Sequence, residues 1–531
     1  MTSALLLVVL LCATVAAAIL AKRLGIPYPI AFVIGGIGLA FVPHLHEPKI
    51  DPQLIFLLVL PPLLHAGGWQ TDLEEFKRNL RPIALLAVGL VLFSTCIIAV
   101  IGHAVLGLDW TMAFTLGAIV SPPDAVAAES IFERMSVPRR VMAVLSGEGL
   151  LNDATALVLY RVALAAAVSG VFSLSHTLLS FPIVAIGGLV IGLLTGFIVE
   201  AVLRLLARGD LEDSTISTVI VLIAPYASYL PADALNVSGV VAVVTTGIYL
   251  NRRSTKIMSS EARVVSLAVW QVMIFLLNAF VFLLIGVELP RLVSSFGASL
   301  TSFIDDAVIV SVAAILIRIV WVYPATWLPR ALFRRIRATD PVPSWRWIAV
   351  IAWSGMRGIV SLAAALALPY TDALGHPLRG RAEIIFITLC VIVATLVFQG
   401  LTLGPIIAWL GVGETHNLQQ RETKIRIRAL EAGVRRLHEL QSGFHTSDEW
   451  EVAARLLDEY ERRIEHLRGH LRDGARENEE ETESAVDHRL QRALLQAERD
   501  EIARLRQAGE IPDDSFRSIA YDLDLAELRL R

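Results

Sequence analysis

Residues 146–160 read Ser-Gly-Glu-Gly-Leu-Leu-Asn-Asp-Ala-Thr-Ala-Leu-Val-Leu-Tyr. This stretch places Glu148, Asn152 and Asp153 inside a segment that is otherwise apolar enough to span a lipid bilayer. An ionised carboxylate at membrane depth is costly, so it usually faces a partner charge or a water-filled cavity. Two acids in one apolar helix therefore indicate a path for cations or protons through the membrane.

The composition of the chain is that of a membrane protein with one polar domain attached. Of its 531 residues, 55% are hydrophobic, and the mean hydropathy is +0.62. Residues 1–413 contain the apolar runs and carry 26 basic and 23 acidic residues, a net charge of +3. Residues 414–531 carry 20 basic and 27 acidic residues, a net charge of −7. We therefore expect a transmembrane domain at 1–413 and a helical, soluble domain at 414–531.

A membrane-spanning helix needs about 20 mostly apolar residues. The first candidate, at the N-terminus, lacks a basic start and a small-residue cleavage site, so we interpret it as a retained helix. The sequence contains thirteen candidate spans, at 3–20, 28–43, 53–67, 82–106, 110–128, 141–168, 181–206, 214–230, 236–250, 262–289, 305–328, 345–369 and 382–410. The predicted fold class is all-α, a polytopic membrane protein.

Loop charge predicts the orientation, because Lys and Arg favour the cytoplasmic side. With the N-terminus outside, thirteen spans place nineteen Lys and Arg residues in cytoplasmic loops and four in external loops. We therefore expect a multi-pass protein of the cell membrane with a cytoplasmic C-terminal domain. In that domain the spacing predicts amphipathic helices, a capping box at Thr446 and Glu449, and an acidic link at 477–483. Regulation or dimerisation is its expected role.

Ser121, Pro122, Pro123 and Asp124 interrupt the fifth span. Proline breaks a helix and frees backbone carbonyls, which at membrane depth are tolerated where they line a cavity and can bind cations there. Asp124 would add negative charge beside them. The structural alternative is a proline kink in which Asp124 caps the second half-helix.

The sixth span carries the central candidates. Glu148 and Asn152 are four residues apart and share a helix face, and Asp153 lies on the adjacent row. Carboxylate and carbonyl oxygens bind cations, and a carboxylate can take a proton instead, so Asp153 is the predicted shared cation and proton site. Glu148 fits a ligand or a salt-bridge partner equally well. Asn152 could brace the helices or contribute its amide oxygen.

Two arginines lie deep in apolar segments, Arg357 in the twelfth span and Arg318 in the eleventh. An arginine at this depth needs a counter-ion, and we expect Glu148 to pair first with Arg357. The alternative for either arginine is snorkelling to an interface. Spans five and twelve, interrupted by Pro and Gly, would occupy corresponding places in two inverted repeats. Paired interrupted helices of this kind indicate the binding site of a transporter.

These motifs together resemble the cation:proton antiporter family that includes bacterial NhaP-type sodium/proton antiporters and animal sodium/proton exchangers. The resemblance covers about residues 1–411 and rests on four motifs: Ser121-Pro-Pro-Asp124-Ala-Val, Gly147-Glu-Gly-Leu-Leu-Asn-Asp153, Val237-Ser-Gly-Val-Val-Ala242 and Gly355-Met-Arg-Gly358. It implies a thirteen-helix fold with a dimerising scaffold and a mobile ion-binding bundle. It also implies that Asp153 carries the ion beside Asp124, that Glu148 pairs with an arginine, and that Asn152 accompanies electroneutral exchange.

Two departures from the family pattern bear on the cation. Gly149 stands where the family often has Ser, and His65-Ala66 stands where many prokaryotic members have Phe followed by an acid. The expected function is Na⁺/H⁺ antiport by a homodimer, with K⁺ or Li⁺ as alternative cations. Rival hypotheses are an intramembrane aspartyl protease using Asp124 and Asp153, whose Gly-x-Gly-Asp signature is absent, and a channel or sensor. We expect no enzyme activity, cofactor or nucleic-acid partner.

Overall fold

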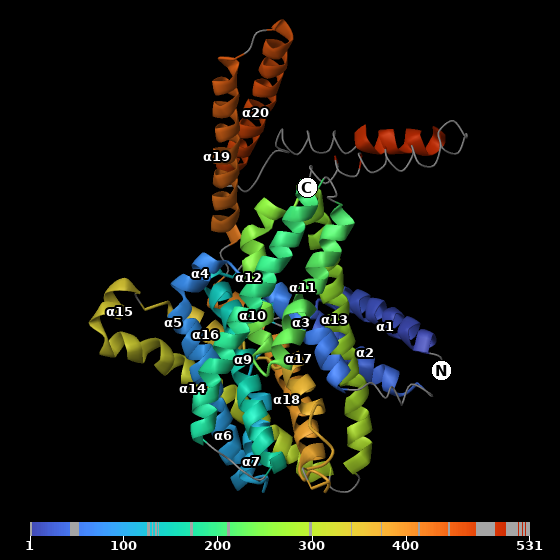
Figure 1. The fold of residues 1–531 in the computed structure, drawn as a ribbon, viewed down its shortest axis with the longest axis vertical. Coiled ribbons are helices and arrows are strands. Elements are labelled where there is room, and N and C mark those ends of the chain that lie inside the picture. The colour runs from blue at the N-terminus through green and yellow to red at the C-terminus, as the bar shows by residue number, and fades with distance from the viewer. Residues whose placement is uncertain are drawn as a thin grey trace. The chain divides into compact units, whose positions relative to one another are not determined.

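The computed structural model describes residues 3–42, 52–124, 128–129, 131–132, 135, 137–169, 174–209, 213–296, 300–340, 342–372, 374–412, 415–443, 446–473 and 494–505, with positions 519, 523 and 526. The regular elements in these ranges are helices (Figure 1). The extended structure that they contain is an isolated antiparallel bridge between Thr371 and Pro377. The all-α prediction is therefore confirmed for the described part of the chain.

The chain divides into two compact units, Met1–Glu414 and Thr415–Arg531. The first unit begins with short and medium helices: α1 Ser3–Leu24, α2 Tyr28–Ala40, α3 Pro52–Gln70, α4 Leu73–Arg78, α5 Leu80–Ala84, the π-helix η1 Leu85–Leu90, α6 Val91–Ala104 and α7 Trp110–Val120. It continues with α9 Arg139–Ser169, α10 Leu174–Arg208, α11 Ser214–Ala234, α12 Gly239–Ile257, α13 Ser260–Phe296, α14 Leu300–Leu332, α15 Arg334–Thr339, α16 Trp345–Trp353, α17 Ile359–Leu366 and α18 Arg381–Leu410.

Each of the thirteen predicted spans contains helix in the described ranges. Two of them are interrupted, as proline and glycine predict: α7 ends before residues 121–124, and residues 354–358 separate α16 from α17. Within the described residues, seven helices are long and apolar enough to cross a membrane, namely those over 80–104, 139–169, 182–208, 214–234, 260–294, 300–332 and 381–410. Membrane-spanning character is thus established by composition, while the count of thirteen stays a prediction.

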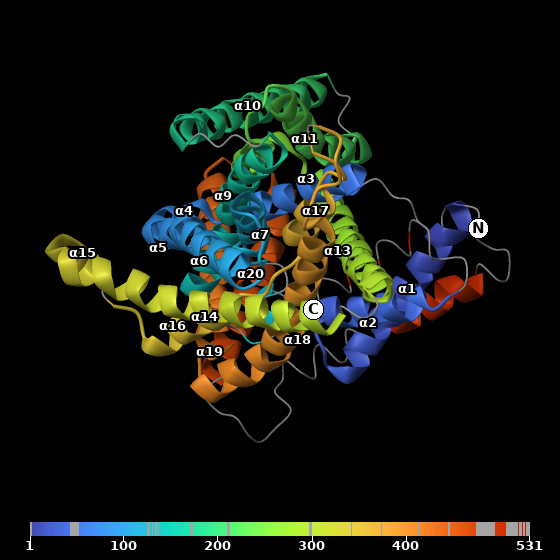
Figure 2. The same cartoon turned by 90° about the horizontal axis from the view of Figure 1, so that it is seen from below.

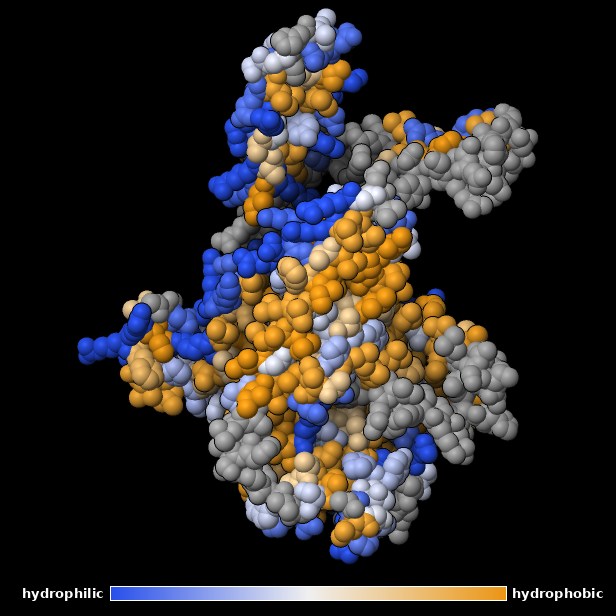
Figure 3. All heavy atoms as spheres, in the orientation of Figure 1, coloured by the Kyte–Doolittle hydropathy of each residue, from blue (hydrophilic) through white to orange (hydrophobic). Residues whose placement is uncertain are grey.

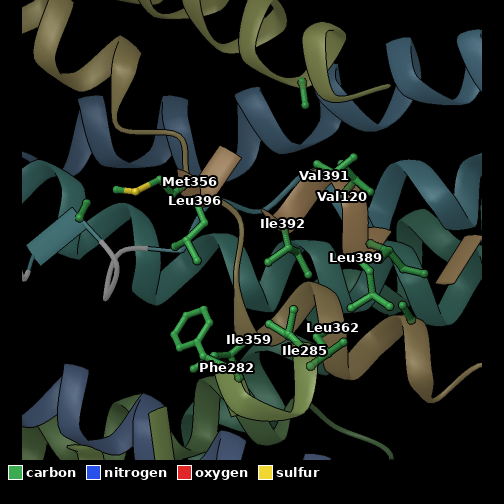
Figure 4. Packing of buried hydrophobic residues seen from close by; sticks show 14 of the residues in the cluster. Val120, Phe282, Ile285, Met356, Ile359, Leu362, Leu389, Val391, Ile392 and Leu396 are labelled. Atoms are coloured by element: carbon green, nitrogen blue, oxygen red, sulfur yellow. The ribbon is translucent and has the colours of Figure 1, made fainter. Parts of the chain in front are cut away.

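Helix α18 lies near the middle of the first unit (Figures 1 and 2). Its side chains are apolar on nearly all sides, which is typical of a helix that is buried in protein or in a membrane. It packs against α13, α14, α16 and α17. Figure 4 shows Leu389, Ile392 and Leu396 in this cluster, beside Met356 and Ile359 from the second interrupted segment. The core therefore holds the interrupted segment against a rigid helix.

Glycines allow close contact between α2 and α13. A Cβ on Gly36 would overlap the backbone of Leu283 and Gly286, and a Cβ on Gly286 would overlap the backbone of Val33 and Gly36. Small residues of this kind are typical of membrane helices, where van der Waals packing rather than the hydrophobic effect drives association.

On the face shown in Figure 3, a broad apolar surface covers much of the first unit. Helix α10 contributes strongly to the exposed apolar side chains, with Ile186, Val190 and Phe197 among them. Monomeric soluble proteins rarely expose contiguous apolar surface of this extent. Lipid chains are the expected surroundings.

The second unit contains α19 Thr415–Gln441 and α20 Ser447–Asp473, which form an antiparallel hairpin (Figure 1). Arg468 Nη2 lies 2.7 Å from Glu431 Oε1 across this hairpin. The predicted capping box is confirmed, since the Glu449 N–H donates to Thr446 Oγ1 at 3.3 Å and the Thr446 N–H donates to Glu449 Oε2 at 2.9 Å. The predicted link at 477–483 lies outside the described residues.

Candidate ion-binding site

The two interrupted segments meet inside the first unit. The Asp124 N–H donates to the Met356 carbonyl at 2.7 Å, and the Asp124 carboxylate accepts the Ile359 N–H at 3.3 Å. From the other segment, Arg357 Nη1 donates to the Ser121 carbonyl at 2.5 Å. The backbone groups that Pro122 and Pro123 leave outside a regular helix are thus partly satisfied by a segment more than two hundred residues away in sequence.

Charged side chains of opposite sign bind the C-terminal end of α7 and the N-terminal end of α17. Arg357 binds the carbonyl of Ser121, the C-terminal cap of α7, and Asp124 binds an N–H at the start of α17. A helix C-terminus carries partial negative charge and an N-terminus partial positive charge, so both contacts are favourable. Asp124 is therefore a capping residue of α17. The predicted cap on the second half of its own segment concerns residues outside the described ranges and stays a prediction.

Asn152 joins α9 to the first interruption. Its Nδ2 donates to the Pro123 carbonyl at 2.9 Å, and the side chain is fully buried. The Oδ1 atom is also buried and has no hydrogen-bond partner among the described residues. A buried amide oxygen without a partner is costly. Asn152 thus braces the helices, as one alternative predicts, and retains an oxygen for a ligand, as the other does.

Asp153 differs from the other embedded acids. Its side chain is partly buried, and it forms no hydrogen bond or ion pair with the residues that the structure describes. Asp124 lies close enough to act on it electrostatically. A carboxylate that is close to a second acid and has no fixed partner is available to bind a cation or a proton.

Glu148 and Arg318 form a buried, bidentate ion pair. Arg318 Nη1 lies 2.5 Å from Glu148 Oε1, and Nη2 lies 2.9 Å from Oε2. The two side chains are 2% and 1% exposed. Arg318 Nε also donates to the Ile351 carbonyl in the last turn of α16 at 3.1 Å. Glu148 is therefore a salt-bridge residue, and its carboxylate is fully engaged.

The prediction that Arg357 would be the first partner of Glu148 is wrong. Its guanidinium reaches the carbonyl of Ser121 instead, because the crossing of the interrupted segments places it against α7. Arg318 and Arg357 are each 1% exposed, so the snorkelling alternative is wrong for both. Arg357 Nε is buried without a hydrogen-bond partner among the described residues.

Two polar residues of α18 support the second interruption, and the sequence analysis did not identify them. Thr395 Oγ1 accepts the Arg357 N–H at 3.1 Å, and Gln399 Nε2 donates to the Trp353 carbonyl at the end of α16 at 2.8 Å. Their spacing of four residues in an apolar span places them on one helix face. This spacing is the feature of the sequence that could have identified the two residues.

Fold and site together define a membrane transporter in which two interrupted helices meet beside embedded acids. The transmembrane family of sodium/hydrogen exchangers matches residues 7–409, and the chain belongs to this family. The resemblance expected from the motifs is therefore confirmed.

Relatives extend the comparison beyond the transmembrane unit. An uncharacterised Na⁺/H⁺ exchanger of Mycobacterium tuberculosis is 31% identical over 99% of this chain and 95% of its own length. A sodium, potassium, lithium and rubidium/H⁺ antiporter of Bacillus subtilis is 33% identical over 71% of this chain and 57% of its own. The solved structure of the sodium proton antiporter MjNhaP1 from Methanocaldococcus jannaschii has a similar fold, with a TM-score of 0.60 and 20% identity over 76% of this chain and 98% of that one.

Proposed function

We propose that this protein exchanges Na⁺ for H⁺ by alternating access, with Asp153 carrying each ion in turn. The observation that supports the proposal most directly is the charge balance of the site. Glu148, Asp124 and Asp153 oppose Arg318 and Arg357, so three negative and two positive charges leave a net charge of −1. One monovalent cation or one proton at Asp153 brings the sum to zero.

The bonding of the acids favours Asp153 as the carrier over the other two carboxylates. Both oxygens of the Glu148 carboxylate accept hydrogen bonds from Arg318, and the Asp124 carboxylate accepts the Ile359 N–H at the start of α17. Releasing either would leave a buried partner without its hydrogen bonds, which is costly. Asp153 has no such bond to the described residues. Ion exchange at Asp153 therefore leaves the surrounding structure intact.

The oxygen atoms near Asp153 suit a hard monovalent cation. The Oδ1 atom of Asn152 has no partner among the described residues, and Asp124 adds negative charge. Gly149 supplies no hydroxyl one turn before the carboxylate, so the ligand set is sparse. The relative from Bacillus subtilis is named for transport of sodium, potassium, lithium and rubidium. K⁺/H⁺ exchange at the same site is therefore the second candidate, with Li⁺ a further cation to test.

Charge neutralisation also explains the proposed coupling. A site with a net charge of zero crosses a low-dielectric barrier at lower cost than one with a net charge of −1. The empty site should therefore move rarely, which limits leak. Because either ion neutralises the site equally, the exchange should be one cation for one proton and electroneutral.

Proton movement in proteoliposomes tests the proposal. An internal pH-sensitive dye reports exchange when Na⁺, K⁺, Li⁺ or the non-transported control choline is added outside. We expect proton movement with Na⁺ but not with choline, and the rate should change less than about twofold under an imposed potential. Moving one net charge through about 100 mV is worth about 2.3 kcal/mol, so a channel would respond strongly. Cation-independent or strongly voltage-dependent proton flux would contradict the proposal.

Alternating access predicts that α9 moves relative to α11. Arg161 on α9 lies 2.9 Å from Asp233 on α11, and both side chains are about half exposed. In a variant whose native Cys12, Cys96 and Cys390 are replaced by serine, we expect a bifunctional thiol reagent joining Arg161→Cys to Asp233→Cys to reduce exchange at least about tenfold. Each single-cysteine variant with the same reagent is the control. Unimpaired exchange in a fully cross-linked sample would contradict this movement.

Gly358 should be required for the crossing of the interrupted segments. A Cβ at this position would overlap the Asp124 carboxylate. Overpacking typically costs about 1–3 kcal/mol, so we expect Gly358→Ala to lower the thermal unfolding temperature and to reduce exchange about tenfold. Gly404→Ala on α18 is the matched control, because nothing lies within 4 Å of its Cβ. Equal behaviour of the two variants would show that the crossing tolerates a side chain.

We further propose a cell-membrane location with the N-terminus outside and the second unit in the cytoplasm. The excess of Lys and Arg in alternate loops supports this orientation. The family resemblance supports a homodimer, and the polar helical hairpin of the second unit is proposed to serve dimerisation or regulation. Membership in a transporter family supports the absence of enzyme activity.

A further inference from the structure

Three arginines surround a single carboxylate at one end of the transmembrane unit. Arg81 Nη2 lies 2.5 Å from Asp340 Oδ2, Arg140 Nη2 lies 2.6 Å from Oδ1, and Arg330 Nη2 lies 2.8 Å from Oδ2. We call Arg81, Arg140 and Arg330 the arginine cluster. They come from α5, α9 and α14, so the cluster joins three different helices.

The cluster has excess positive charge. Burial opposes ionisation of Asp340, but the hydrogen bond from Arg140 and the charges of Arg140, Arg330 and Arg81 outweigh it and hold the pKa of Asp340 below its usual range. The carboxylate is therefore ionised near neutral pH. No other carboxylate forms an ion pair with the cluster among the described residues. Three guanidinium groups against one carboxylate leave a net charge of +2.

One donor of the cluster is unused. Arg81 Nε is buried and has no hydrogen-bond partner in the described part of the chain. A buried N–H group without an acceptor is costly, so such groups commonly mark a site that a ligand or water completes. By contrast, the Nε and both Nη atoms of Arg330 donate hydrogen bonds to Asp340 and Thr326. The available donor therefore belongs to Arg81.

A small, largely apolar crevice of about 50 Å³ lies beside the arginine cluster. The three arginines line one part of it, and Leu85, Val144, Val322, Ala325, Trp347 and Ile351 line the rest. These side chains come from η1, α9, α14 and α16, and α14 lies beside α16 (Figures 1 and 2). This crevice is too small for an acyl chain, so a ligand of the arginine cluster keeps any long apolar part outside it.

The position of the crevice indicates the source of such a ligand. Arg81 and Arg140 lie at the start of two candidate membrane spans, and Arg330 lies at the end of a third. Trp327 and Trp345, near these ends, are each 56% exposed. Exposed tryptophan is typical of the boundary between lipid and water. The crevice is therefore placed where phospholipid headgroups meet acyl chains.

We propose that the arginine cluster binds the headgroup of an anionic phospholipid from the adjacent leaflet, with its phosphate on Arg81 and Arg140 and its acyl chains on the lipid-facing surface. Basic pockets between membrane helices favour anionic headgroups through charge and hydrogen bonds. The position of the cluster at the boundary between lipid and water favours a lipid over free phosphate. Because Arg140 begins the helix that carries Asp153, a bound lipid would also stabilise the end of that helix.

Native mass spectrometry of the full-length protein in detergent micelles tests the site. Phosphatidylglycerol and phosphatidylcholine with the same acyl chains are compared, and we expect about tenfold tighter binding of phosphatidylglycerol. Arg81→Gln should reduce this preference to about twofold or less. Arg140→Gln, which removes the second proposed phosphate contact, should reduce the preference in the same way. Arg208→Gln, at an exposed arginine of α10, is the control and should bind as the wild type does.

Several outcomes would overturn the proposal. Equal binding of the two lipids by the wild type would do so without any variant, even if Arg81→Gln failed to fold. Unchanged binding in both Arg81→Gln and Arg140→Gln would show that lipid binds elsewhere. Displacement of phosphatidylglycerol by inorganic phosphate alone would identify a site for free anions. The lipid measurement is independent of ion exchange, so it can fail while the proposed function stands.

Discussion

Replacing Asp153 with asparagine is expected to abolish cation-coupled proton movement in proteoliposomes, with a loss of at least about 100-fold. A neutral amide cannot release a proton or offer a full negative charge to a cation, so the site would have no ion to exchange. The charge sum of the site would be fixed at zero, and a bound Na⁺ would make it +1. A 100-fold loss corresponds to about 2.7 kcal/mol.

The folded state of the Asp153→Asn variant should remain intact. Asp153 forms no hydrogen bond or ion pair with the described residues, so its charge has no bound partner to leave unpaired. We expect a thermal unfolding temperature equal to or above that of the wild type. Asp109→Asn, at an exposed position before α7, makes the same chemical change outside the site and should alter exchange by less than about twofold. Exchange that persists in Asp153→Asn would overturn the proposed mechanism.

The sequence predicted the arrangement of the site at the level of segments. Pro122 and Pro123 cannot continue a regular helix, and Gly355 and Gly358 flank an arginine, so both interruptions were visible in the residues themselves. The thirteen apolar segments contain helix in the described ranges because hydrophobic length is a strong local signal. Asp153 and Asp124 were chosen because acids are rare at membrane depth.

Contacts between segments could not be predicted in the same way. Glu148 needed an arginine, and the sequence offered two without giving the distance from α9 to either. The partner of Arg357 is the backbone carbonyl of Ser121, and a backbone acceptor has no signature in residue type. Gln399 likewise has a backbone partner, the Trp353 carbonyl, so this contact also has no signature in residue type. Pairing is set by the register of neighbouring helices, which periodicity within one helix does not contain.

The arrangement of charges separates structural from exchangeable acids. Arg318 contacts Glu148 and the end of α16, whereas Arg357 contacts the end of α7. Each arginine therefore offsets the partial negative charge of a half-helix C-terminus at membrane depth. Asp124 does the same for the N-terminus of α17. These fixed pairs support the proposal that Asp153 is the acid whose charge varies.

Removal of Glu148 should damage the fold rather than only the transport. Glu148→Ala leaves Arg318 buried at 1% exposure without its counter-ion, and breaking such a pair typically costs about 3–5 kcal/mol. We expect a large fall in the thermal unfolding temperature in detergent. Arg291→Ala is the control in the same unit, since its contact with Glu288 is 3.5 Å long and Arg291 is 60% exposed. A pair of that kind contributes at most about 1 kcal/mol.

The double variant Glu148→Leu/Arg318→Met distinguishes a broken ion pair from lost packing. Replacing both partners of a buried pair with apolar side chains is often neutral or stabilising, so most of the lost stability should return. The recovery should stop about 1 kcal/mol short, because the Ile351 carbonyl loses the Arg318 Nε donor. If Glu148→Ala were as stable as Arg291→Ala, Glu148 would not be a structural acid. The assignment of ion exchange to Asp153 alone would then lose its main support.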